Sequence, residues 1–175
     1  MDSSDFPTFV SGRCSVREYE ETPLSEEEIA YIVSCAGRAP SAGNLEAWDV
    51  VVVTDAEARF ALAEAALGQE HVGAAPALFV VCANYVRSMS KYGERGILYA
   101  VQDATIACTY MMLAAHSHGL STCWNGAFDE DDVREILDLP PHIRPIAILS
   151  AGYGRMPARR AGRMDITEHL HHEVW

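Results

Sequence analysis

Two arginines and a serine near the front of the chain have the types and spacing that suit anion binding. They lie in the run Arg13-Cys14-Ser15-Val16-Arg17. If this run is extended, alternate side chains share a face, so Arg13, Ser15 and Arg17 point the same way. Arginine offers planar, two-pronged hydrogen bonding, and three donors on one side would hold an anion together with a carbonyl-rich ring. The alternative is a solvated charged segment that pairs with Glu18, Glu20 and Glu21.

The charge balance narrows the class of partner. The chain has 175 residues and a formal net charge of −12, which argues against nucleic acid and against a membrane surface, because both attract basic patches. Four arginines nevertheless fall within nine residues that contain no acid: Arg155, Arg159, Arg160 and Arg163. A basic run in an acidic protein indicates a specific small anion. The length fits one domain, residues 1–175, with its own core.

The cysteines and the apolar runs bear on the compartment. Five cysteines are widely spaced without a C-x-x-C pair, at positions 14, 35, 82, 108 and 123. We interpret them as free structural thiols of a reducing compartment. The front of the chain shows no secretory pattern, and the most apolar stretch, 104–115, is too short to span a bilayer. We therefore expect a cytoplasmic protein.

Helices and strands alternate along the chain. Ser25 and Glu28 form a capping box, and apolar residues at helical spacing follow them to about Arg38. The valine run 48–53 predicts a strand buried on both faces. Further helices are expected at 5–10, 55–67, 99–118 and 129–137, the last capped by Asp129. Further strands are expected at 77–83, 121–124 and 145–153, of which the first and the last are buried, and extended chain is expected at 13–19. The order predicts a layered mixed α/β or α+β domain.

Two segments leave alternatives open. Residues 84–96 mix aromatic and basic side chains around two glycines, which is typical of either a lid or an irregular surface connection. The helix at 99–118 is apolar almost all round, so it needs either a central position or a partner subunit. Homodimerisation through this helix is our hypothesis.

Four stretches in this order resemble the FMN-dependent nitroreductase family. Residues 13–17 are similar to its R-x-S-x-R signature, and Ala39-Pro40-Ser41-Ala42-Gly43-Asn44-Leu45-Glu46-Ala47-Trp48 to its A-P-S-x-x-N-x-Q-P-W strand entry. Residues 114–128, with Trp124-Asn125-Gly126, resemble its helix–GLGT–W–G–F segment. Ile148 to Gly154 and the arginines after it resemble its last strand and phosphate-binding tail. The resemblance runs from about residue 9 to 175.

The resemblance implies a fold and a function. The fold would be an α+β sandwich with a central, mainly antiparallel sheet flanked by helices, in an intertwined homodimer with FMN at the subunit interface. The enzyme would pass hydride from NADH or NADPH through flavin N5 to a small aromatic, nitro or quinone-like acceptor, with ping-pong kinetics. Because the flavin carries the chemistry, no side chain is assigned as catalytic. No metal is expected, and His169, His171 and His172 are interpreted as a surface cluster.

The resemblance also assigns cofactor-binding roles by position. Arg13 and Ser15 would hold the phosphate or ribityl oxygens, Arg163 or Arg160 would complete the phosphate site, and Arg17 would lie beside N1 and O2. Pro40, Ser41, Ala42 and Asn44 would reach the partner's flavin. Backbone N–H groups of Trp124, Asn125 and Gly126 would lie near O4 and N5, although Trp124 also suits a core. The full expected set is Arg13, Cys14, Ser15, Arg17, Pro40, Ser41, Ala42, Asn44, Trp124, Asn125, Gly126, Arg160 and Arg163.

Three departures from the family pattern keep other functions open. Glu46 stands where the family often has Gln, Ala47 replaces the usual Pro, and Gly154 replaces a Pro that often follows the Gly-Tyr pair. Glu46 introduces an anion near the expected site, so a reductive dehalogenase of the same fold is an alternative. A non-catalytic FMN carrier or sensor is another. Arg87, Lys91 and Arg95 are candidates for the phosphates of the dinucleotide.

Overall fold

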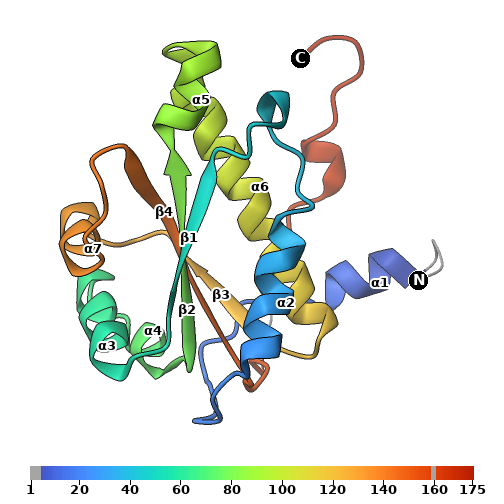
Figure 1. Cartoon of the computed structure of the whole chain (residues 1–175). Helices are drawn as coiled ribbons and strands as arrows, with labels where there is room; N and C mark the ends of the chain where they lie inside the picture. The colour runs from blue at the N-terminus through green and yellow to red at the C-terminus, as the bar shows by residue number, and fades with distance from the viewer. Residues whose placement is uncertain (1–4, 159–160) are drawn as a thin grey trace.

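The computed structural model describes residues 5–158 and 161–175, and a sheet runs through the middle of this part of the chain (Figure 1). Its strands are β1 (Trp48–Val53), β2 (Ala77–Asn84), β3 (Ser121–Asn125) and β4 (Ile143–Gly152), in the spatial order β1-β2-β4-β3. Each neighbouring pair is antiparallel. All eight residues of β2 are buried, because this strand has a neighbour on each side and a layer of helices on each face.

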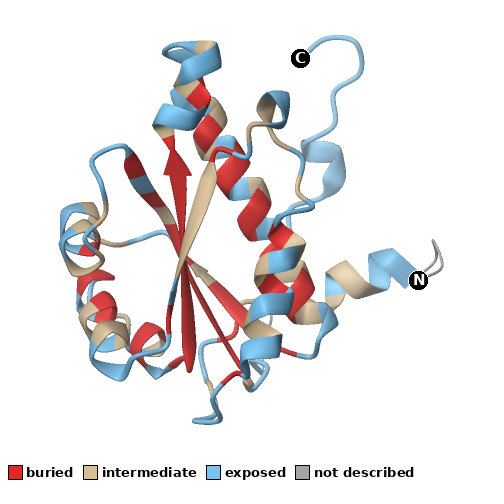
Figure 2. Cartoon of the chain, viewed as in Figure 1, coloured by how far each residue is buried: buried red, intermediate tan, exposed pale blue. Residues whose placement is uncertain are grey.

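Alternation along β2 divides the core into two layers. Phe79 and Val81 pack with α6 (Arg95–Ser117) and α2 (Glu26–Ala36) on one face. Leu78 and Val80 pack with α3 (Ala56–Ala65), α4 (Glu70–Ala74) and α7 (Glu130–Ile136) on the other. Figure 2 shows the buried residues along the sheet and along the inner side of α6. The expected α+β sandwich with an antiparallel sheet is confirmed.

The prediction that strand 48–53 is buried on both faces is wrong. β1 lies at the edge of the sheet, where it pairs with β2 alone. Most of its residues are half-buried, and Val52 is 38% exposed. An edge strand has a neighbour on one side only, so a run of valines there does not require full burial.

Helix ends follow the local chemistry of the sequence. Ser25 Oγ accepts a hydrogen bond from the Glu28 N–H at 3.2 Å, and the Ser25 N–H donates to Glu28 Oε2 at 2.7 Å, which is the predicted capping box. At the start of α7, the Asp129 side chain is a simple N-cap that accepts from the N–H groups of Asp131 and Asp132. The single turn α4 was not predicted, because five residues are too few for a helical pattern to show.

The segment 84–96, expected to be a lid or an irregular connection, is largely helical. Its helix, α5 (Tyr85–Tyr92), begins at Asn84, whose side chain accepts a hydrogen bond from the Arg87 N–H at 3.0 Å. Gly93 then turns the chain with φ +54° into α6. The sequence did not predict this helix, because the aromatic and basic residues on its solvated outer face obscure the helical pattern.

The long apolar helix is longer than predicted and is buried on one side only. The side of α6 that faces the sheet includes Ala100, Ala104, Ala107, Cys108 and Met111, all buried, whereas Ile97, Leu98 and Tyr110 are each about two-fifths exposed. α6 is long and apolar enough to cross a membrane by length and composition alone, a test that buried core helices also pass. Here it packs on the sheet.

The first and last segments complete the fold. The N-terminal helix is α1 (Asp5–Gly12), and 3-10 turns lie at η1 (Ala42–Asn44) and η2 (Ile166–Glu168). The tail after β4 leaves the body of the molecule and crosses to the side of α1 and α2 (Figure 1). Its apolar side chains Met164, Ile166, Leu170, Val174 and Trp175 are exposed in the single chain.

Candidate functional site

The run 13–17 lies beside the edge strand β3. Ser15 forms an isolated parallel bridge with Thr122, and the Val16 N–H donates to the Thr122 carbonyl at 3.0 Å. Val16 is 1% exposed and anchors the run in the core. Because side chains alternate along extended chain, burial of Val16 turns Ser15 and Arg17 to the other side.

The C-terminal tail starts next to the same run. Tyr19 pairs with Gly154, and the Arg155 N–H donates to the Glu18 carbonyl at 2.9 Å. A Cβ at position 154 would lie 2.7 Å from Val16 Cγ1 and 2.8 Å from the Glu18 oxygen. A side chain at this position would therefore force the surrounding chain to shift, so the close packing depends on glycine.

Arginines from both ends of the chain line one cavity of about 480 Å³. We call it the arginine cavity; its lining residues are Val10, Ser11, Arg13, Cys14, Ser15, Arg17, Pro157, Ala161 and Arg163. Among residues 5–158 and 161–175, no acidic side chain lines it, although the chain carries 25 Asp and Glu. Guanidinium and hydroxyl donors without a competing carboxylate suit a phosphate or a similar oxyanion. Arg160 lies outside the described residues.

The pKa of the Cys123 thiol depends on the positive charges on this side of β3. Burial raises its pKa, while a hydrogen bond from Ser15 and the positive charges of Arg17 and Arg13 act in the opposite direction. Ser15 and both guanidiniums are thus close enough to β3 to act on the same atom. Positive charge from Arg13 and Arg17 therefore gathers beside β3.

Residues 40–42 line a second cavity, of about 470 Å³, which we call the loop cavity. Pro40, Ser41 and Ala42 form one wall, and the other is the α6 face with Tyr99, Val101, Gln102, Asp103, Thr105 and Ile106. Asn44 is exposed at the end of η1. None of these residues lines the arginine cavity, so a single chain does not bring the two predicted groups of residues to one cavity.

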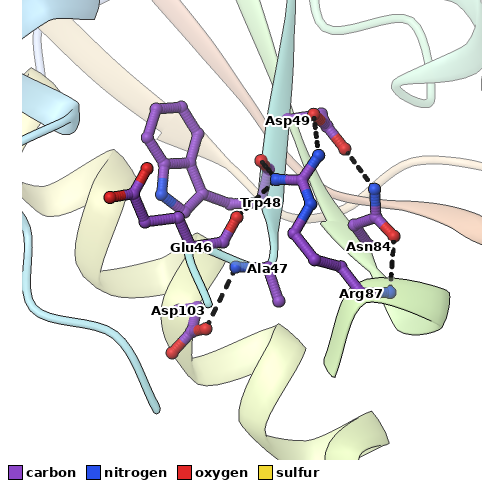
Figure 3. A network of polar contacts seen from close by, with 7 residues as sticks. All are labelled: Glu46, Ala47, Trp48, Asp49, Asn84, Arg87 and Asp103. Atoms are coloured by element: carbon purple, nitrogen blue, oxygen red, sulfur yellow. Dashed lines mark hydrogen bonds and ion pairs between the residues drawn. The ribbon is translucent and has the colours of Figure 1, made fainter. Parts of the chain in front are cut away.

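A network of polar contacts holds the entry to β1 (Figure 3). The Arg87 guanidinium donates to the carbonyl oxygens of Glu46 and Trp48, and it forms an ion pair with Asp49 at 3.1 Å. Asn84 Nδ2 donates to the other Asp49 oxygen at 2.7 Å. Arg87 therefore has a structural role at the β1 entry and is not available to bind the phosphates of a dinucleotide. Lys91 and Arg95 remain candidates for that role, because both are exposed beside the aromatic rings of Tyr92 and Tyr99.

The residues at the end of β3 divide between the two faces of the sheet. Trp124 is half-buried against the α6 layer, and Gly126 is close to its indole, since a Cβ there would lie 3.2 Å from Trp124 Nε1. The Asn125 side chain is buried, donates to the Ile148 carbonyl at 2.8 Å and lies 2.6 Å from His71 Nε2. That side chain joins β3 to β4, so only the backbone of Asn125 is left for a ligand.

Sequence reasoning missed Asp103 and Tyr99, which line the loop cavity. The signal for Asp103 was a single carboxylate within an apolar helix. The histidines of the tail are placed as surface residues, with His171 stacked on Trp175 at 4.3 Å between ring centroids. Within residues 5–158 and 161–175, no cluster of three His, Cys, Asp or Glu side chains could hold a metal ion.

Comparison with known proteins adds independent information. The sequence matches the Nitroreductase family over residues 10–72 and 63–153. An NADH dehydrogenase of Thermus thermophilus is 32% identical over 177 residues, covering 85% of this chain and 86% of that protein. The FMN reductase (NADPH) of Bacillus subtilis is 29% identical over 163 residues, covering 85% of this chain and 64% of that protein. The solved structure of B. megaterium NfrA1 superimposes with a TM-score of 0.91 at 28% identity, over 97% of this chain and 74% of that one.

Proposed function

This chain belongs to the nitroreductase family, and from that premise we propose that it is an FMN-dependent oxidoreductase. It takes electrons from NADH or NADPH and passes them to a small acceptor of the aromatic, nitro or quinone-like class. The similarity to an FMN reductase (NADPH) supports the choice of cofactor and of electron donor.

One observation carries the proposal: Arg13, Arg17 and Arg163 line the same cavity together with Ser15. These donors come from segments about 150 residues apart, and the contacts of Gly154 with Val16 and Glu18 bring the segments together. The donor set fits FMN, because the phosphate needs cations and the ring edge needs a donor that tolerates negative charge. The residues present therefore suit the cofactor that the family implies.

The side chains of this protein would bind and orient the cofactor. FMN, when bound, supplies the site that accepts hydride and releases electrons. Arg13, Ser15 and Arg163 hold the phosphate end. Arg17 provides a fixed positive charge beside the N1 and O2 edge, where it stabilises negative charge. The backbone N–H groups of Asn125 and Gly126 are oriented by the buried Asn125 side chain.

A second copy of the chain would complete the site. The loop with Pro40, Ser41 and Ala42 has no access to the arginine cavity of its own chain, and apolar side chains of α6 and of the tail are exposed in the single chain. We propose a homodimer in which this loop reaches the flavin of the partner. A well-folded monomer in equilibrium sedimentation at micromolar concentration would contradict it.

The test of the function starts from the purified protein. We expect a yellow protein that releases FMN on denaturation and whose flavin absorption is bleached anaerobically by NADH or NADPH within seconds. Bound FMN that neither nucleotide reduces would favour the carrier instead. Faster turnover of a halotyrosine than of nitroaromatics or quinones would favour the dehalogenase, for which the exposed Glu46 is the residue to substitute first. A colourless protein that does not bind added FMN would refute the proposal.

A further inference from the structure

Asp103 carries a carboxylate in an apolar environment. The residue lies on the sheet-facing side of α6 and is 2% exposed, and its helix neighbours Ala100, Ala104 and Ala107 are fully buried. The ion pairs within residues 5–158 and 161–175 join Arg87 to Asp49 and Arg144 to Glu130, so no cation pairs with Asp103 there. A buried carboxylate without a cation is unfavourable unless hydrogen bonds compensate it. Hydrogen bonds must therefore compensate for a carboxylate at a position where the neighbouring residues of the helix are alanines.

Two hydrogen bonds of Asp103 show what its carboxylate does in the structure. Oδ1 accepts from the Ala42 N–H at 2.9 Å, and Oδ2 accepts from the Ala47 N–H at 3.2 Å. The two donors are at opposite ends of the loop 42–47. Figure 3 shows the Asp103 side chain directed from α6 toward Ala47. One carboxylate thus connects both ends of this loop to the longest helix of the structure.

The loop needs such an anchor because its backbone is strained. Asn44 and Glu46 have positive φ, at 57° and 48°, and this region is unfavourable for residues with a side chain, whereas Gly43, at 59°, adopts it without that cost. Inside the loop, the Glu46 N–H donates to Ser41 Oγ at 3.0 Å. Arg87 binds carbonyl oxygens at the outer side of the β1 entry. Asp103 alone among these groups holds the loop from the buried side.

We propose that Asp103 is a positioning residue: it fixes the loop 42–47 and thereby holds Ala42, with the adjoining Pro40 and Ser41, in the shape that binds FMN. This inference rests on the proposed function, in which Pro40, Ser41 and Ala42 reach the flavin of the partner. Asp103 acts through backbone N–H groups and does not itself touch the cofactor.

The test compares Asp103→Asn with the wild type as reconstituted holoprotein. The amide has the same shape but replaces one acceptor by a donor, so one of the two N–H groups loses its partner. We expect the Kd for FMN to rise tenfold or more, which corresponds to about 1.4 kcal/mol. We also expect the visible circular dichroism of the bound flavin to change, a signal that a general loss of stability would leave unaltered. Asp103→Ala, which removes both acceptors, should have the larger effect.

Asp49→Asn is the matched control. It makes the same chemical change at the β1 entry, but Asp49 accepts from the side chains of Arg87 and Asn84 and from no loop N–H. Its FMN affinity should stay within about twofold of the wild type, less than about 0.4 kcal/mol. An equal loss in both variants would assign the effect to the β1 entry in general and overturn the proposal.

The remaining outcomes separate this inference from the proposed function. If the wild type binds FMN and Asp103→Asn binds it equally well, the inference fails and the proposed function stands. If the wild type binds no FMN, both fail. Should both Asp103 variants fold poorly, amide hydrogen exchange of the wild-type apoprotein decides: the Ala42 and Ala47 N–H groups should be protected, and exchange as fast as in exposed loops would overturn the proposal.

Discussion

Replacing Arg13 with Gln should weaken FMN binding far more than riboflavin binding. Arg13 is half-buried and lines the arginine cavity, where the described part of the chain places no acid. Riboflavin has the ring and the sugar alcohol of FMN but lacks the phosphate. A residue that binds the phosphate therefore discriminates between the two flavins, whereas a residue that only maintains the fold affects both equally.

The expected size follows from the burial of the guanidinium. A hydrogen bond between charged groups contributes about 1.5–3 kcal/mol, which corresponds to about 10–150-fold in Kd. Partial burial places Arg13 in the upper part of this range. Arg163 is exposed, so water and salt screen its charge, and Arg163→Gln should lose about tenfold or less.

The assay is titration of each flavin with apoprotein, followed by quenching of flavin fluorescence, at low and at high salt. Arg38→Gln is the control, because Arg38 is exposed beyond the end of α2, does not line the arginine cavity and changes the net charge by the same amount. Equal losses for FMN and riboflavin in Arg13→Gln, or a loss of the same size in Arg38→Gln, would refute the assignment of the phosphate to this cavity.

Three further predictions concern the edge of the FMN ring, the start of the C-terminal tail and the loss of fold stability at low pH. Arg17→Gln should lower the reduction potential of bound FMN, because the cation beside N1 and O2 favours the reduced flavin; an unchanged potential in a flavin-bound variant would reject this role. Gly154→Ala should destabilise by about 1–3 kcal/mol in urea unfolding through overpacking, whereas Gly162→Ala, where a Cβ would meet nothing within 4 Å, should have little effect. The pKa of Glu28 is lowered below 4.5, and the hydrogen bond from Tyr153 is the largest cause. This carboxylate therefore stabilises the fold above pH 4.5, and its contribution is lost as the pH falls through its folded pKa. Glu28→Gln should therefore lose less stability on acidification than the wild type does, and identical pH profiles would contradict this.

The sequence predicted those features that depend on neighbouring residues. The capping box at Ser25 and the Asp129 cap are local chemistry, since each is completed within four residues. The continuous apolar run of β2 predicted its full burial correctly. The valine run of β1 did not, because burial depends on which strands lie beside it. Likewise, the buried face of α5 could not be predicted from its own residues, because packing against α6 defines it.

For the site, the sequence by itself determined the family, and it predicted that the arginines and serine of the run 13–17 bind an anion. Spacing along extended chain and the basic tail carry that information, since both depend on residue type alone. Only the tertiary structure decided that Arg163 joins Arg13 at one cavity, that residues 40–42 line a different one, and that Asp103 holds both ends of the loop 42–47. These residues lie 56 to about 150 positions apart in the sequence. They come together because close packing at Gly154 and burial of α6 join distant segments, which no local pattern predicts.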